Sequence, residues 1–374
     1  MNKIIHITNF TRKDVVDGGT NREDALSNFL VKKRSENILV CNNNFKSNFL
    51  GKLKRPSEII NEISYKQPDF VVLNYPSYPF YWQHKVTIFY MLSNIFSRKL
   101  KKASEKYAFD IIIDIMDLPA FQYNDLGFKL EMNPKTLMKF DKKIFSNSNY
   151  LWVCSKNLSN LIMDKYSIEN YKIIIALNGY SKEAVSKKKP ISDVLKFAYA
   201  GSLNKERGIK ELIESFLSAD RQNIELHICG LYGEWIREEY DDRRIIYYGS
   251  KTNDGASNIL SKCDIGLIPY PQSGYYQLAF ATKLPFYLSL GTPILCSNVD
   301  ETGSYIKKYN FGMTWDINDF TSAFSYITDN KDIIDNWKNS VFENRHIFSW
   351  DNIYSSALLE TIKRARREMG SFYG

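Results

Sequence analysis

The segment FAYAGSLNKERG, from Phe197 to Gly208, constrains the fold most strongly because it holds three structural signals in one order. Its apolar start predicts a buried strand, Gly201 predicts a tight turn, and a helix is expected to begin near Gly208. Such a turn presents backbone N–H groups and a helix N-terminus together, which suits a phosphate group. A second segment, residues 282–297, has the order helix, glycine turn and strand. Both segments indicate an α/β architecture.

Strand and helix signals alternate along the whole chain, and the apolar runs are continuous, as is typical of parallel strands covered on both faces. The expected strands are 3–7, 37–41, 70–73, 110–116, 151–154, 172–176, 195–200, 224–229, 245–248, 265–268 and 293–296. The expected helices are 24–33, 56–64, 84–107, 210–217, 256–263, 282–290 and 300–308.

A polar, basic segment interrupts this alternation at residues 181–190, SKEAVSKKKP, and predicts a linker. With 374 residues the chain is long enough for two domains. We therefore expect domains at 1–185 and 186–349, with a ligand cleft between the carboxyl edges of their two sheets.

The composition favours some kinds of partner and site and excludes others. The net charge of +8 favours anionic partners such as nucleotides, although a solvated lysine-rich surface explains it equally well. Nucleic acid is not an expected partner, because the net charge is the only feature of the sequence that favours nucleic-acid binding. The five cysteines form no CxxC pair and are expected to be reduced core thiols of a cytosolic protein. No apolar run reaches the roughly 18 residues that span a bilayer, no signal peptide is expected, and the four histidines have no metal-binding spacing.

GSLNKERGIKELIESF resembles the glycine turn and following helix of the glycogen-synthase-like glycosyltransferases, which have the GT-B fold. The resemblance implies an α/β chain with two Rossmann-like domains facing across a cleft, and a nucleotide sugar bound by the C-terminal one. Relatives usually have Arg directly after the glycine and Lys before the second glycine, where this chain has Ser202 and Arg207. Gly201, Ser202 and Arg207 are thus expected donor-binding residues, since an Arg can bind two phosphate oxygens. The alternative for Arg207 is a surface charge.

Lys283 is expected to supply a second cation for the donor. It stands eight residues before Gly291 in TKLPFYLSLGTPI, which resembles the K-L-x-x-Y/F-L-x-x-G-x-P pattern of some relatives. A lysine is unfavourable at a helix N-terminus unless an anion is near; an ordinary surface lysine is the alternative. Retaining relatives usually have a Glu at the position of Phe286 and another near Leu278, and both are absent here. Because some bacterial relatives with this Lys and no Glu invert the anomeric configuration, the resemblance favours inversion.

Two further loops are expected to contact the donor. Gly249 allows close backbone approach at a strand end, and the following SKTNDG resembles the loop that covers the base, although a plain β–α turn fits as well. Tyr276 belongs to the polar aromatic segment YPQSGYYQ, which we expect to face the sugar or the diphosphate.

The N-terminal half has its own glycine-containing loop before a helix, where GT-B enzymes contact donor and acceptor. The residues expected to contact either substrate are Asn9, Gly18, Gly19, Thr20, Asn21 and Arg22. An ordinary β–α loop is the alternative. NFTRKD and REDAL also resemble the start of some bacterial galactofuranosyltransferases.

Asp117 is the candidate general base. In IIIDIMDLPAF it falls at the carboxyl end of an expected strand, where open α/β sheets place their chemistry. From there it could take a proton from an acceptor hydroxyl; a cap of a helix or turn is the alternative. Asp114, within the strand, is expected to have a structural or substrate-orienting role.

The chain end, FSWDNIYSSALLE, resembles the last helix of GT-B enzymes, which crosses back onto the N-terminal domain, so residues 350–374 are assigned there with Trp350 as a core anchor. The predicted function is the metal-independent transfer of a hexose from a nucleotide sugar, with a UDP-sugar favoured, to a glycan, glycolipid or glycoprotein acceptor. The protein is expected in the cytoplasm. Residues 78–102 mix aromatic and basic side chains and suit peripheral membrane contact, or else a core helix. A non-catalytic GT-B subunit that binds a sugar nucleotide, or stabilises a partner transferase, is the alternative function.

Overall fold

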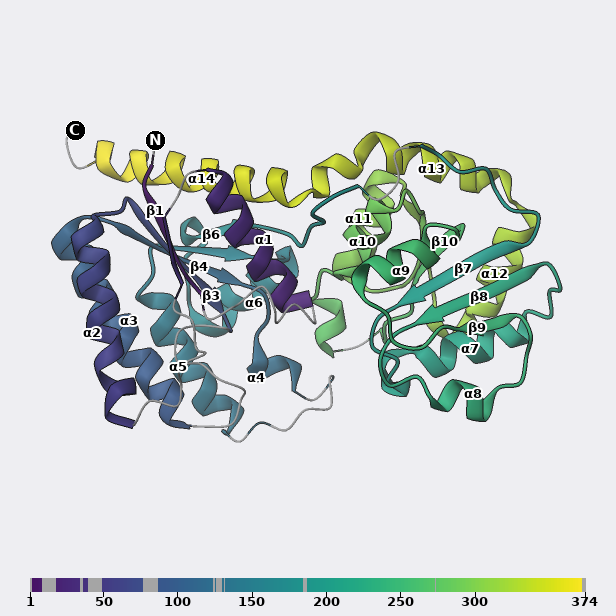
Figure 1. Cartoon of the computed structure of the whole chain (residues 1–374), viewed down its shortest axis with the longest axis horizontal. Helices are drawn as coiled ribbons and strands as arrows, with labels where there is room; N and C mark the ends of the chain where they lie inside the picture. The colour runs from purple at the N-terminus through teal and green to yellow at the C-terminus, as the bar shows by residue number, and fades with distance from the viewer. Residues whose placement is uncertain are drawn as a thin grey trace. The chain divides into compact units, whose positions relative to one another are not determined.

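The computed structural model describes residues 2–8, 18–33, 36–39, 49–76, 87–123, 125, 130, 132–183, 187–272 and 274–371. It forms two compact units (Figure 1), one of residues 1–177 with 353–374 and one of residues 178–352. From the sequence, we expected the domain boundaries at 185/186 and 349/350. In the structure the second unit begins at Asn178, so the described residues of the expected linker, 181–183 and 187–190, belong to that unit.

The N-terminal unit is built on a six-stranded parallel sheet in the order β2-β1-β3-β4-β5-β6. Its strands are β1 (Ile4–Thr8), β2 (Glu36–Leu39), β3 (Phe70–Tyr75), β4 (Asp110–Ile115), β5 (Tyr150–Val153) and β6 (Ile173–Ile175). Its helices are α1 (Gly18–Lys32), α2 (Phe49–Lys66), α3 (Thr87–Tyr107), α4 (Pro119–Gln122), α5 (Pro134–Ser146) and α6 (Lys156–Tyr166). The continuous apolar runs become strands such as β3, whose six residues are all buried.

The last helix, α14 (Trp350–Ser371), packs on this unit although it follows the other one in sequence (Figure 1). The Trp152 indole Nε1 of β5 donates to Thr361 Oγ1 at 2.9 Å, and Tyr354 Oη donates to the Arg22 carbonyl oxygen at 3.3 Å. Trp350 at the helix start is buried. These contacts fix α14 against both a strand and a helix of the N-terminal unit.

A buried carboxyl group on α5 gives this unit a specific dependence on pH. Asp141 accepts hydrogen bonds from Tyr75 Oη at 2.6 Å and from Tyr166 Oη at 3.3 Å, and all three side chains are fully buried. Burial raises the pKa of Asp141 to about 7, with the two hydroxyl groups opposing that shift. The folded protein therefore keeps a proton that the unfolded chain has already lost above its ordinary carboxyl pKa.

We expect this carboxyl group to lower the stability of the wild type by on the order of 1 kcal/mol per pH unit between about pH 4 and pH 7. Asp141→Asn, which can still bond both hydroxyls, should abolish that contribution. The comparison with the variant is needed because buried His6, whose pKa burial lowers to about 4, contributes a slope of opposite sign. Urea unfolding of both proteins at pH 5 and pH 7 measures the difference; equal changes in the two proteins would contradict the assignment.

The C-terminal unit holds a second six-stranded parallel sheet, in the order β12-β11-β10-β7-β8-β9. Its strands are β7 (Leu195–Ala200), β8 (Ile224–Cys229), β9 (Ile245–Tyr247), β10 (Ile265–Ile268), β11 (Ile294–Ser297) and β12 (Gly312–Trp315). Its helices are α7 (Ile209–Ser218), α8 (Trp235–Glu239), α9 (Asn253–Leu260), α10 (Lys283–Ser289), α11 (Asp300–Tyr309), α12 (Phe320–Asp329) and α13 (Asp332–Asn344). The chain moves outward from β7 in both directions, so β7 and β10 are neighbours at the point where the strand order reverses.

Several elements differ from the sequence expectation. Helix α1 begins at Gly18, six residues before the predicted start, so Gly18 and Gly19 open a helix instead of forming a loop. Strand β12 was not predicted because its residues, GMTW, are only half-buried and give no apolar run. The four cysteines that the structure describes are buried and free of disulfides; Cys41 lies outside the described residues.

Candidate functional site

Three glycine turns meet at the carboxyl edge of the C-terminal sheet. Gly201 follows β7, Gly230 follows β8, and Gly249 comes shortly after β9. Gly201 N donates to Cys229 O at 3.1 Å and Gly230 N donates to Gly249 O at 3.0 Å. A Cβ on Gly230 would lie 1.7 Å from the Gly201 oxygen, so the turns pack backbone against backbone. By contrast, a Cβ on Gly249 would meet nothing within 4 Å, so Gly249 borders open space.

Arg207 stands directly before helix α7, in the short 3-10 turn η4 (Lys205–Arg207). Gly208 then takes φ +78°, and a Cβ there would lie 1.8 Å from the Pro269 oxygen after β10. Arg207 is half-buried, and its Nε is buried with no hydrogen-bond partner. A buried guanidinium N–H without a partner is costly, which is typical of a group that a ligand completes.

Lys283 is the first residue of α10, and only 8% of its surface is exposed. Its Nζ donates to Tyr270 Oη at 3.2 Å and lies 5.0 Å and 5.1 Å from the ring centroids of Tyr199 and Tyr270. A Cβ on Gly201 would lie 2.8 Å from this Nζ, so the ammonium group contacts the turn after β7. Among the described residues, no carboxylate lies within ion-pair distance of Lys283 or Arg207.

Tyr199 connects the two cations to the turn. Its Oη donates to the Ser202 carbonyl oxygen at 3.0 Å. Burial raises the pKa of Tyr199, and the charges of Lys283 and Arg207 both oppose that shift. Both cations therefore act on one phenol group, and the structure brings the predicted donor residues Gly201, Ser202, Arg207 and Lys283 together around it.

The remaining predicted donor residue, Tyr276, packs on Tyr270, the hydrogen-bond partner of Lys283. It belongs to the 3-10 turn η5 (Gly274–Gln277), is buried, and packs its ring 4.9 Å from that of Tyr270. Gln277 beside it accepts from Asp300 N at 2.6 Å and caps α11. Phe286, at the position where the resemblance would put a Glu in retaining relatives, is half-buried, and its ring lies beside that of Tyr287.

In the N-terminal unit, the predicted base Asp117 lies two residues beyond β4, half-buried, just before the short helix α4. Gly18, Gly19, Thr20 and Asn21 form the first turn of α1, where Asn21 is exposed. Asn9 lies outside the described residues.

Arg22 does not have the substrate-facing position that we expected. Its guanidinium is fully buried and bonds both oxygens of Asp114, Nε to Oδ2 at 2.9 Å and Nη2 to Oδ1 at 2.6 Å. It also donates to the Ala176 and Leu177 carbonyl oxygens at 2.7 Å and 2.9 Å. Asn74 donates to Asp114 Oδ2 at 3.2 Å. Arg22 and Asp114 therefore form a structural ion pair that ties α1 to β4 and to the end of β6.

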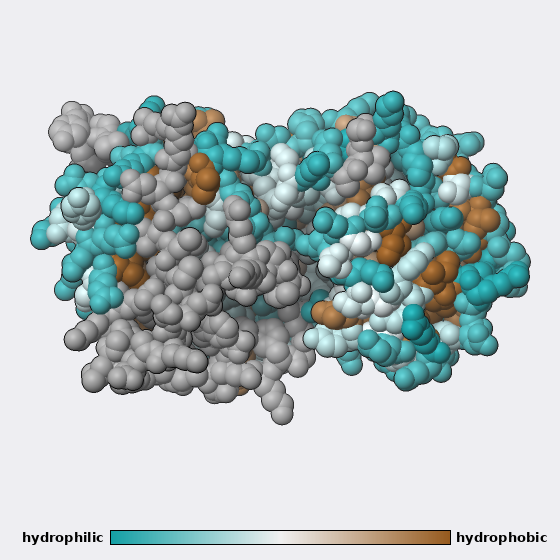
Figure 2. Space-filling view, viewed as in Figure 1, coloured by the Kyte–Doolittle hydropathy of each residue, from teal (hydrophilic) through white to brown (hydrophobic). Residues whose placement is uncertain are grey.

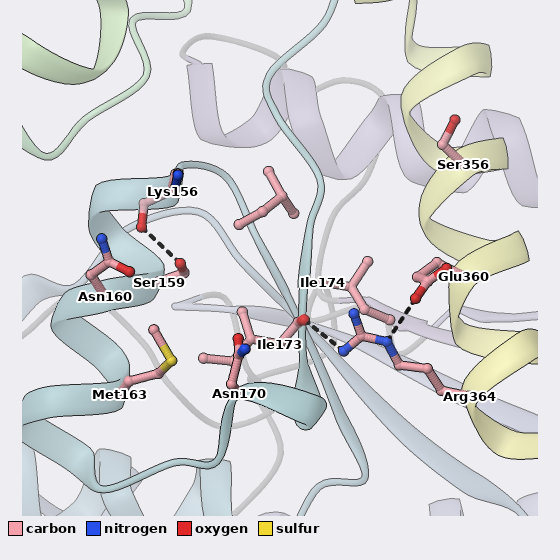
Figure 3. A pocket seen from close by; sticks show the side chains of 11 residues that line it. Lys156, Ser159, Asn160, Met163, Asn170, Ile173, Ile174, Ser356, Glu360 and Arg364 are labelled. Atoms are coloured by element: carbon pink, nitrogen blue, oxygen red, sulfur yellow. Dashed lines mark hydrogen bonds and ion pairs between the residues drawn. The ribbon is translucent and has the colours of Figure 1, made fainter. Parts of the chain in front are cut away.

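A pocket of about 560 Å³ opens elsewhere on the N-terminal unit (Figure 3). Its walls come from α6, β6 and α14, and Arg364 crosses it to donate to the Ile173 carbonyl oxygen at 2.9 Å. Its lining includes none of the predicted site residues. The structure therefore gives no support for assigning either predicted substrate to this pocket.

Tyr199 was not predicted as a residue of the cation site; Tyr270 was, as part of YPQSGYYQ, but its hydrogen bond with Lys283 was not. Tyr199 is on β7 and Tyr270 follows β10, so only the neighbouring positions of these strands bring them together. The one sequence signal that could have predicted this contact is the presence of a tyrosine near the carboxyl end of each strand. Among the residues that the structure describes, no group of three or more His, Cys, Asp or Glu side chains could hold a metal ion.

No protein-family model matches the sequence, and no curated protein matches it by sequence. Solved structures do match over nearly the whole chain. The lipopolysaccharide outer core galactosyltransferase WaaB, in its apo form, superposes with a TM-score of 0.62 at 16% identity, covering 96% of this chain and 99% of WaaB.

Two other similar structures are a glycosyltransferase from Rickettsia africae and Anabaena HepE in complex with UDP-glucose. Their TM-scores are 0.66 and 0.65 at 12% identity each. Both alignments cover 97% of this chain, with 98% of the Rickettsia protein and 100% of HepE. The chain therefore has the GT-B fold of these glycosyltransferases, and the predicted fold class is confirmed.

Proposed function

We propose that this protein is a glycosyltransferase that transfers a hexose from a nucleotide sugar, UDP-linked by preference, to a glycan, glycolipid or glycoprotein acceptor. The observation that carries the proposal is the pair of cations Arg207 and Lys283, which have no carboxylate partner among the described residues and share a glycine turn at the carboxyl edge of β7. Similar structures support it, since HepE is described in complex with UDP and with UDP-glucose.

The diphosphate is the part of the donor that this site fits best. Arg207 can bond two phosphate oxygens through its planar fork, and Lys283 adds a compact charge beside the Gly201 turn. The N-terminus of α7, which has no side-chain cap, adds backbone N–H groups. Together these groups would stabilise the leaving diphosphate as its charge grows, so no metal ion is required in the proposed mechanism.

For the acceptor, we assign the general base to Asp117. A base at the end of β4 would remove the proton of the attacking hydroxyl, whose oxygen bonds to the anomeric carbon as the bond to the diphosphate breaks; this single displacement inverts the anomeric configuration. The absence of Glu at the Phe286 position supports this choice over retention. It also supports the alternative of a non-catalytic GT-B subunit that binds a sugar nucleotide or stabilises a partner transferase, because the side chains of retaining relatives are missing.

Release of UDP separates these two functions. We expect the purified protein to release UDP from at least one member of a panel of UDP-hexoses when a bacterial glycolipid or oligosaccharide mixture is present. The Lys283→Met variant is the control for contaminating hydrolases. A protein that binds UDP tightly yet releases none from any donor with any acceptor would favour the non-catalytic subunit.

One face of helix α3 suits contact with an anionic membrane. A cytoplasmic enzyme with a lipid-linked acceptor would need such contact to reach that acceptor. Met91 and Ile95 are 52% and 44% exposed, and Arg98, Lys99 and Lys102 follow as exposed cations. Residues 91, 95, 98 and 102 recur at helical spacing, so apolar and basic groups share one face. Among the described helices, none is both long and apolar enough to cross a membrane. The face of the C-terminal unit seen in Figure 2 is mainly hydrophilic with scattered hydrophobic patches.

We predict that the protein sediments with vesicles containing phosphatidylserine at low salt and does not sediment with neutral vesicles. Changing Arg98, Lys99 and Lys102 to Gln should weaken this binding at least tenfold, since each surface cation contributes about 1 kcal/mol. The matched control changes Lys262, Lys307 and Lys308, exposed on the C-terminal unit, in the same way. Equal loss in both triple variants would show that net charge, and not α3, determines binding.

A further inference from the structure

Two tyrosines, Tyr199 and Tyr270, surround the buried ammonium group of Lys283. A buried ammonium group loses its hydration, and that loss must be offset by other contacts. Here the Lys283 ammonium contacts the Tyr270 hydroxyl, with Nζ to Oη at 3.2 Å, the Tyr199 hydroxyl, and the faces of both rings, whose centroids lie 5.0 Å and 5.1 Å from Nζ. Aromatic faces attract a cation without neutralising it. The charge of Lys283 therefore stays available to an anion.

The same contacts fix where that charge lies. The Lys283 Nζ is held between the rings of Tyr199 and Tyr270, and its contact with Gly201 keeps it at the turn. Tyr199 Oη bonds the Ser202 carbonyl, so the first ring is tied to the turn itself. Tyr270 is anchored separately, because Ser297 Oγ donates to its carbonyl oxygen at 2.6 Å. One tyrosine on β7 and one just after the neighbouring strand β10 thus both hold this cation.

We infer that Tyr270 is a positioning residue for recognition of the donor diphosphate. Its hydroxyl accepts one of the three N–H bonds of the Lys283 ammonium and so fixes the position of that charge beside the Gly201 turn. A carboxylate in the same place would hold the lysine equally well but would repel a diphosphate. The tyrosine orients the lysine without that repulsion. The inference rests on the proposed donor site and adds a residue that acts on the diphosphate through Lys283.

A double-mutant cycle tests this role, with UDP and inorganic diphosphate as probes in calorimetry. Tyr270→Phe keeps the ring and removes the hydroxyl, and we expect it to weaken binding of both probes by about three- to tenfold. In the Lys283→Met background, the same change should alter affinity by less than about twofold, because the group it positions is gone. A merely structural role would give the same loss in both backgrounds.

The control is Tyr305→Phe, the same change at a half-buried tyrosine of the same unit, whose ring packs on Phe280 and Phe348. It should leave both affinities unchanged. Loss of UDP affinity with unchanged diphosphate affinity in Tyr270→Phe would overturn the inference, because the residue would then act on the nucleoside. If the wild type binds neither probe, the proposed function fails; if it binds and the cycle shows no coupling, the positioning role alone fails.

Discussion

Asp117→Asn is expected to slow transfer by a factor of about 10² to 10⁴, the usual contribution of a general base. The asparagine has nearly the same shape but cannot accept a proton at neutral pH. Because Asp117 belongs to the N-terminal unit and the cation site to the C-terminal unit, affinity for UDP should remain unchanged. Initial rates with saturating UDP-sugar, together with UDP calorimetry on the same preparation, measure both quantities.

The control for this variant is Asp164→Asn, which makes the same change at an exposed carboxylate of α6 in the same unit. It should retain full activity. The product anomer, determined by NMR, tests the stereochemical part of the proposal. An Asp117→Asn protein with normal turnover, or a product that keeps the donor's configuration, would remove Asp117 from the mechanism.

The sheets of both units could be predicted from sequence because they are parallel and covered on both faces. Their strands are continuous apolar runs, as in IIIDI of β4 and LHIC of β8, and such runs have few other stable environments. Strand β12 shows the limit of this argument. Its GMTW sequence has no apolar run, and it is a strand because Gly312 lets its backbone approach β11, where a Cβ would lie 1.9 Å from the Ile294 oxygen.

The glycine turn after β7 was also predictable, since Gly201, Arg207 and Gly208 are close in sequence and their order indicates strand, turn and helix. Gly208 shows why the residue type matters: only glycine can take φ +78° while its α-carbon faces the Pro269 oxygen. Side-chain partners that are distant in sequence were not predictable. The tyrosines around Lys283 depend on how β7 and β10 are paired.

Arg22 is the clearest error of the sequence interpretation. An arginine after a glycine pair near the chain start fits a substrate loop, and nothing local distinguishes that role from a structural one. Its partner Asp114 is 92 residues away, and the two form a buried, bidentate pair. Removing one partner of such a pair leaves an uncompensated buried charge, so a single substitution at either position should destabilise the folded protein. Substitution of Arg22 would therefore report on folding, and not on substrate binding.

Arg207 and Lys283 are proposed to bind the diphosphate of a nucleotide, and calorimetry with UDP is the most direct test of this role. Each cation makes charge-assisted hydrogen bonds worth about 1.5–3 kcal/mol, so Arg207→Ala and Lys283→Ala should each weaken binding by roughly ten- to a hundredfold. Half-buried Arg221, which pairs with Asp329, and exposed Lys262 of the same unit provide Ala controls, which should bind as the wild type does. Loss of affinity confined to the two site variants is the predicted result, and unchanged UDP affinity in both of them would contradict the account.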